Sequence, residues 1–138
     1  MVSKEIVIWS IQSLKTNFMF LQLAYTKLDV YKFSRKLALE CYKVTRNFPS
    51  DEKYAMIQQI RRAALSVHLN IAEGSSRRSD AERKRFYEIA RGSLIEVDTA
   101  LDIAADLNYC TPESIQSLGE TLVKCFKYLS GLISSTTN

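Results

Sequence analysis

Apolar residues recur every three or four positions along most of the chain after residue 27, and this spacing places side chains on one face of an α-helix. The first such segment has apolar positions at Val30, Phe33, Leu37, Cys41, Val44 and Phe48. It predicts a helix from about Asp29 to Asn47, which Pro49 brings to an end.

Two further helices carry signals for their ends. The second is expected to begin after Ser50, a favourable N-cap, and to end at Gly74, because glycine commonly follows the last helical turn. The third opens at Ser79, which forms a capping box with Glu82 three residues later, and it continues to about Asn108. Both segments are therefore expected as long helices.

The fourth helix is expected to start at Thr111 as N-cap, with Pro112 at the first helical position, and its apolar spacing continues to Leu132. Because the connections are short, successive helices should lie antiparallel. The predicted fold class is all-α, an antiparallel up-down four-helix bundle over residues 28–134. Residues 1–27 are expected to form an N-terminal extension, either helical or partly disordered.

The composition is that of one globular domain: 138 residues, of which 46% are apolar and 25% charged. Three cysteines without C-x-x-C spacing argue against a disulfide framework or a zinc site and favour a cytoplasmic location. In the apolar N-terminal stretch, Lys4, Glu5 and Lys15 leave no uncharged run of the ~20 residues that a membrane span needs. We therefore expect neither membrane insertion nor export.

The second predicted helix has more apolar surface than one position in a bundle buries. A bundle helix normally buries a stripe about 100° wide, whereas this helix carries two stripes side by side. A second subunit would cover the additional stripe, so the sequence predicts a homo-oligomer. The first stripe is Ile57, Ile60, Ala64, Val67 and Ile71, and the second is Tyr54, Leu65, Leu69 and Ala72.

The net charge of +4 conceals an uneven distribution. Between residues 27 and 49 there are six basic residues against two acidic ones, and from residue 92 to the end there are two against six. Projection of the first helix gathers five bases opposite its apolar stripe, and a second basic group surrounds the start of the third helix. Phosphate contacts from such residues are the usual basis of sequence-independent nucleic-acid binding. The candidate nucleic-acid-binding residues are Lys32, Arg35, Lys36, Lys43, Arg46, Arg77, Arg78, Arg83, Lys84 and Arg85.

Polar residues form a column along the remaining side of the second helix. If the column is buried, each member needs a partner, because an unpaired buried polar group costs about 1–3 kcal/mol. Two polar residues of the third helix are suitable partners, and Gly92 beside them is expected to permit a close helix approach. The pattern favours a structural polar network over a catalytic site. Its members are Gln59, Arg62, Ser66, Asn70 and Glu73, with Ser93 and Glu96 as partners.

No enzymatic pattern is present in the sequence. The single histidine, His68, follows Leu65 where a di-iron site would need a Glu-x-x-His pair. There is no recognisable nucleophile motif and no glycine-rich phosphate loop. The carboxylates Asp98, Asp102 and Asp106 are aligned on the third helix, but such rows are usually solvated, so we expect no metal and no cofactor. The sequence predicts a protein that is not an enzyme.

Two stretches resemble the signature of the four-helix bundle proteins encoded in intervening sequences of bacterial 23S ribosomal RNA genes. They are the run from Gln59 to Val67, QIRRAALSV, and the run from Asn70 to Gly74, NIAEG. Supporting positions are Phe48-Pro49, Phe86, Ala90, Gly92-Ser93-Leu94 and Glu96, and the resemblance covers roughly residues 28–132.

That family is related to the accessory variability proteins of diversity-generating retroelements, which form pentameric rings and bind nucleic acid and a reverse transcriptase. The resemblance therefore implies a homopentamer with a nucleic-acid or ribonucleoprotein partner, although most members have no established activity. Two hypotheses follow from the sequence. One is a non-catalytic oligomeric module that binds RNA or DNA through its basic surface. The other is a protein-interaction scaffold in which the bases pair with the acidic row of the third helix or with a protein partner.

Overall fold

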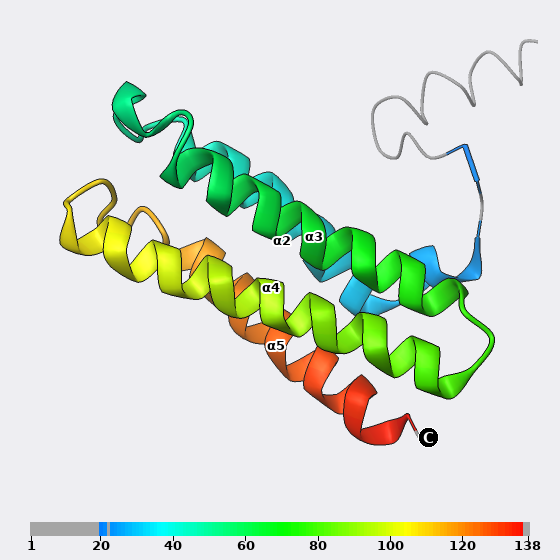
Figure 1. The fold of residues 1–138 in the computed structure, drawn as a ribbon. Coiled ribbons are helices and arrows are strands. Elements are labelled where there is room, and N and C mark those ends of the chain that lie inside the picture. Colours follow the sequence, from blue (N-terminus) through cyan, green and yellow to red (C-terminus); the bar gives the residue numbers. More distant parts are fainter. Residues whose placement is uncertain (1–19, 22, 137–138) are drawn as a thin grey trace, which may run out of the picture.

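The structure is a computed structural model that describes residues 20, 21 and 23–136. These residues form four α-helices and two short 3₁₀ helices, with no strand among them (Figure 1). The α-helices are α2 (Asp29–Thr45), α3 (Met56–Ser76), α4 (Asp80–Asp106) and α5 (Gln116–Ser135), and the 3₁₀ helices are η1 (Ala24–Lys27) and η2 (Ser50–Glu52). The predicted all-α class is confirmed.

Each helix of the bundle packs against two neighbours. Helix α2 contacts α3 and α5, and α4 contacts the same two, whereas the diagonal pairs do not pack together in the described part of the chain. Successive helices run in opposite directions (Figure 1). This is the up-down four-helix bundle that the sequence predicts. Of the expected extension over residues 1–27, residues 1–19 and 22 lie outside the described residues, and η1 packs against α2 and α3.

The core lies between the four helices and is built from their predicted apolar faces. Leu37, Ile60, Leu94 and Leu129, one from each helix, are fully buried. Burial of a side chain of this size contributes about 1.5–3 kcal/mol relative to leaving it in water. The predicted first stripe of α3, from Ile57 to Ile71, is buried throughout.

The apolar spacing of the third and fourth predicted helices also includes Ile89, Leu107 and Phe126, but these three residues are exposed, by 42%, 49% and 40% respectively. Ile89 directly precedes the buried Ala90, so it lies about 100° away from the buried face of α4. Phe126 follows the buried Cys125 and is displaced from its face in the same way. Leu107 lies beyond the last residue of α4, where the helical face ends.

The start of α3 differs from the prediction. Ser50 opens η2 instead, and α3 begins only at Met56, because Ala55 has a non-helical backbone with φ −121° and ψ −99°. Glu52 Oε2 accepts a hydrogen bond from Met56 N at 3.1 Å. The side chain that satisfies a free amide at this helix start is therefore that of Glu52.

Gly74 does not end α3. The helix continues to Ser76, and the backbone at Gly74 has no positive φ. A Cβ added at Gly74 would lie 2.9 Å from Phe86 Cβ, closer than carbon atoms approach without a shift. Glycine is needed here because α3 and α4 approach closely. The expectation that Gly92 permits this approach is wrong, since a Cβ at Gly92 would meet no atom within 4 Å.

The predicted start of α4 agrees with the structure, whereas the predicted start of α5 does not. Ser79 Oγ accepts from Glu82 N at 3.1 Å, which confirms the predicted cap of α4. Thr111 Oγ1 accepts from Ser114 N at 3.2 Å, but the regular helix starts only at Gln116. Ile115, with φ −114° and ψ 10°, interrupts the helical backbone between that turn and α5, so the predicted start of the fourth helix is wrong.

Arg61 of the QIRR run holds the end of α2. Its Nε donates to Thr45 Oγ1 at 2.9 Å, and its Nη2 donates to the carbonyl oxygen of Tyr42 at 3.3 Å. The guanidinium also lies 4.7 Å from the centroid of the Tyr42 ring. A cation at a helix C-terminus satisfies free carbonyls and opposes the negative end of the helix dipole.

Candidate nucleic-acid interface

The five predicted bases of α2 are all exposed and form what we call the basic ridge, made of Lys32, Arg35, Lys36, Lys43 and Arg46. They lie opposite the buried residues Leu37 and Cys41, so the packing of the core fixes their direction. Within the span of the ridge the only acidic residue is Glu40, which gives five positive charges against one negative, a net charge of +4. Leu39 is exposed among these bases, a feature the sequence reasoning missed.

The ridge is little neutralised by the rest of the described chain. Lys36 Nζ lies 3.8 Å from Glu40 Oε1, and Lys36 itself is more than half exposed. An exposed pair of this kind contributes little, because water screens it. No other ridge residue has a carboxylate within ion-pair distance among the described residues. Most of the ridge charge is therefore available to an external anion.

The second basic group, at the start of α4, is partly used by the fold. Arg77 makes an ion pair with Glu73, and its guanidinium lies 5.1 Å from the Phe86 ring centroid. Arg83 Nε donates to the carbonyl oxygen of Arg77 at 2.7 Å. These two arginines hold the α3–α4 connection. The more exposed members of the group are Arg78 and Arg85, whereas Lys84 is half-buried.

The ten predicted bases belong to two parts of the fold, the basic ridge and the segment around the start of α4. The first residues of α2 and of α4 lie at the same end of the bundle (Figure 1). However, α2 and α4 are diagonal helices that do not contact each other. Of these two groups the ridge has more exposed charge, because all five of its bases are exposed, whereas in the second group Arg78 and Arg85 are exposed.

The predicted polar column faces α4, and several of its members are hydrogen-bonded. Ser66 Oγ lies 2.8 Å from Ser93 Oγ, and Asn70 Nδ2 donates to Ser66 Oγ at 3.0 Å. Gln59 Nε2 donates to Glu96 Oε2 at 3.1 Å in a more exposed part of the column. Arg62 and Glu73 are exposed. The structure thus joins α3 to α4 through polar contacts at Ser66 and Gln59.

His68 is placed as a packing residue at the α2–α3 interface. Its Nδ1 lies 2.7 Å from Ser34 Oγ, and its ring centroid is 4.4 Å from that of Tyr31. Burial, and secondarily the charge of Arg35, lowers the His68 pKa. Ser34 is fully buried and its hydroxyl donates to the carbonyl oxygen of Tyr31 at 2.9 Å, so no substrate reaches this pair. Ser34 and His68 therefore share with a catalytic nucleophile and base only the hydrogen-bond distance between them.

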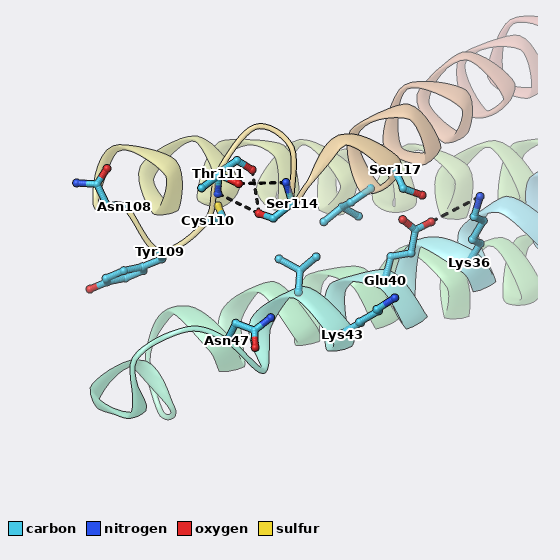
Figure 2. A pocket seen from close by; sticks show the side chains of 12 residues that line it. Lys36, Glu40, Lys43, Asn47, Asn108, Tyr109, Cys110, Thr111, Ser114 and Ser117 are labelled. Carbon is cyan, nitrogen blue, oxygen red and sulfur yellow. Dashed lines mark hydrogen bonds and ion pairs between the residues drawn. The ribbon is translucent and has the colours of Figure 1, made fainter.

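Beside the ridge, an open pocket of about 570 Å³ lies between α2 and the segment that leads into α5 (Figure 2). Lys36, Glu40 and Lys43 of α2 line one wall, and Ser114, Ser117 and Leu118 line the other. Thr121 Oγ1 donates to Glu40 Oε1 at 2.8 Å, which fixes this carboxylate against α5. The sequence places Lys36 and Lys43 on one face of α2 but gives no signal for the opposite wall, which depends on which helix packs beside α2.

The described residues show neither a metal site nor a membrane span. Nowhere in residues 20, 21 and 23–136 do three His, Cys, Asp or Glu side chains gather in a way that could hold a metal ion. The row of Asp98, Asp102 and Asp106 is exposed on α4. None of the helices described is long and apolar enough to cross a membrane.

Comparisons with known proteins agree with this architecture. A crystal structure of a protein of unknown function from the S23 ribosomal protein family of Bacteroides thetaiotaomicron matches with a TM-score of 0.69 and 25% sequence identity. The match covers 77% of this chain and 99% of that one. A comparison with curated proteins gave no match. The family model described as 23S rRNA-intervening sequence protein matches residues 26–131, and the chain therefore belongs to this family.

Proposed function

We propose that this chain is a non-catalytic, self-associating four-helix bundle module that binds nucleic acid, RNA above all, through the basic ridge of α2. The observation that carries the proposal is the row of five exposed bases with a single weak ion pair. From Lys32 to Arg46 the ridge extends along about 21 Å of helix, long enough to contact several successive phosphates. Such contacts hold a nucleic acid without reading its sequence.

Self-association is supported by apolar surface on the outer side of α3. On α3, Leu65 is 38% exposed and Leu69 61% exposed, and Tyr54, which precedes the helix, is 81% exposed. Contact between large apolar side chains and water is unfavourable, and a second copy of the chain would cover them. An assembly would also bring several basic ridges together. The pentamer that the family resemblance implies is part of this proposal.

The second candidate function is a protein-interaction scaffold without a nucleic-acid role. It is favoured by one observation, the exposed acidic row of Asp98, Asp102 and Asp106 on α4. In an assembly this row could pair with the basic ridge of a neighbouring copy. The ridge charges would then serve subunit contacts.

Charge reversal at two ridge positions separates the two functions. The variant Lys36→Glu/Lys43→Glu should lose most of its affinity for a structured RNA while its oligomeric mass, measured by light scattering, stays unchanged. The control is Lys124→Glu/Lys127→Glu, which makes the same change in net charge at exposed positions of α5, outside the ridge. Dissociation of the oligomer by the ridge variant, with RNA binding unchanged, would favour the scaffold.

A further inference from the structure

We infer that the pocket between α2 and the start of α5 binds a single nucleotide, with the phosphate on Lys43 and the base beside Glu40. The inference deepens the proposed nucleic-acid binding, and it rests on that function only where the nucleotide belongs to an RNA strand. A free nucleotide and an unpaired nucleotide in RNA offer the same chemistry to the pocket. The experiment below distinguishes these two sources.

The size and lining of the pocket suit a nucleotide. A volume of about 570 Å³ lies within the range of about 300–1,000 Å³ that is common for small-molecule sites. Val44, which is half-buried, supplies apolar surface against which a flat ring can pack. Asn47 and Ser117 add an amide and a hydroxyl that can contact a sugar. The pocket therefore combines an apolar part with polar groups around it.

The charges of the pocket are arranged for a molecule with an anionic end. Lys43 is exposed and has no carboxylate within ion-pair distance among the described residues, so its ammonium can hold a phosphate. Glu40 lies one turn away on α2, on the side toward Lys36 (Figure 2). A simple anion would gain from the lysines but would be repelled by Glu40. A molecule that is anionic at one end and carries a hydrogen-bond donor at the other satisfies both.

Glu40 predicts which bases the pocket prefers. A carboxylate offers about four acceptor positions, and here Thr121 takes one, whereas Lys36 Nζ at 3.8 Å from Oε1 is too far away for a hydrogen bond. The remaining positions can accept from the exocyclic amino group of a base, as carboxylates do from N4 of cytosine. Uracil differs from cytosine by an oxygen at the same position, and that oxygen would face the carboxylate. The pocket should therefore prefer cytidine to uridine monophosphate.

Isothermal titration with cytidine and uridine monophosphates tests the inference on the full chain. We expect cytidine monophosphate to bind at least about tenfold more tightly, the loss that follows from one missing hydrogen bond to a charged group. The isosteric change Glu40→Gln should remove this preference, because an amide can both donate and accept. Equal binding of the two nucleotides by the natural chain, or a preference that survives Glu40→Gln, would overturn the assignment of the base.

Two pairs of variants locate the site. Ser117→Trp should fill the pocket and abolish nucleotide binding, whereas Ser134→Trp, at an exposed position of α5 outside the pocket, should not. Lys43→Ala should weaken nucleotide binding about tenfold through loss of a charged donor. Lys127→Ala removes an exposed charge outside both the pocket and the basic ridge, and it should leave nucleotide binding intact. Nucleotide binding that is insensitive to Ser117→Trp would contradict the inference.

An RNA experiment identifies the source of the nucleotide and separates this inference from the proposed function. A hairpin with one unpaired cytidine is compared with a fully paired hairpin of the same length. If the pocket takes its nucleotide from RNA, the bulged hairpin binds more tightly and Ser117→Trp removes only that advantage. If only free nucleotide binds, and no hairpin does, the pocket assignment stands and the proposed function fails. If the hairpins bind equally and no free nucleotide binds, the pocket assignment fails and the proposed function stands.

Discussion

Ser66 Oγ on α3 lies 2.8 Å from Ser93 Oγ on α4, which makes the two hydroxyls partners across the helix pair. Ser93 is buried, so its hydroxyl has little access to water if this partner is removed. A buried polar group left without a partner destabilises a protein by about 1–3 kcal/mol. This contact thus offers a direct measure of what the polar column contributes to the fold.

Ser66→Ala and Ser93→Ala should each lower the free energy of unfolding by about 1 kcal/mol. The double variant should lose less than the sum of the two, by about 0.5 kcal/mol or more, because it leaves neither hydroxyl unpaired. Urea denaturation of the four proteins gives the coupling energy. Strictly additive losses would show that the two hydroxyls do not depend on each other.

Gly74→Ala should destabilise the chain by about 1–3 kcal/mol, because the added Cβ would lie 2.9 Å from Phe86 Cβ. Gly92→Ala is the matched control in the next helix, where the added methyl group meets no atom within 4 Å. It should stabilise α4 by about 0.5–1 kcal/mol through the better helix propensity of alanine. Thermal or urea unfolding measures both, and equal effects at the two positions would contradict the close approach of α3 and α4 at Gly74.

The lowered pKa of His68 predicts that acid weakens the fold. Burial of the imidazole is the main cause of this shift, and the positive charge of Arg35 on α2 is the second. The unfolded chain binds a proton at His68 near its ordinary pKa of about 6.5, whereas the folded chain does so only at lower pH. The free energy of unfolding contributed by His68 is therefore complete above about pH 6.5 and falls as the pH drops toward the folded-state pKa.

His68→Phe isolates this contribution, because the variant has no titrating group at the α2–α3 interface. The difference in unfolding free energy between the natural chain and the variant should change between about pH 8 and about pH 5, with the natural chain losing more. The carboxylates titrate in both proteins, so their contributions to the unfolding free energy cancel in the comparison. Parallel pH profiles would mean that His68 does not titrate differently in the folded state.

The three cysteines should differ sharply in reactivity. Burial, with the nearby charge of Glu40 as the next cause, raises the pKa of Cys41 and of Cys125 to about 12, and both thiols are fully buried. Burial raises the pKa of Cys110 as well, but its thiol is only half-buried at the pocket, so a thiol reagent should modify it first. Mass spectrometry of the native chain should show rapid labelling at Cys110, and labelling of the other two only under denaturing conditions. Rapid labelling of Cys41 would contradict the packing of the core.

The helices and their inner faces could be predicted from the sequence because apolar spacing is a local signal. The N-cap at Ser79 is local as well, and its predicted bond, in which Ser79 Oγ accepts from Glu82 N, is present. The start of α3 and the role of Gly74 could not be predicted, since both depend on contacts of the folded chain. Glu52 reaches forward to Met56 N, and Gly74 lies against Phe86 of the next helix.

The candidate sites show the same division. The basic ridge could be predicted because four of its bases lie on α2 and Arg46 directly follows its last residue, so the buried face of this helix sets their direction. The pocket could not be predicted, because Glu40 and Ser117 are far apart in the sequence and meet only through the packing of α2 against α5.

The salt dependence of binding tests the basic ridge most directly. If the five ridge bases contact phosphates, the logarithm of the affinity for duplex DNA should fall with the logarithm of the salt concentration with a slope of about −4 to −5 per copy engaged. Lys32→Ala should make this slope shallower by about 0.9. Titrations of duplex DNA and of a structured RNA between about 50 and about 200 mM salt provide the measurement. A steep slope that Lys32→Ala reduces is the predicted result, and no binding to either nucleic acid at the lowest salt would contradict the account.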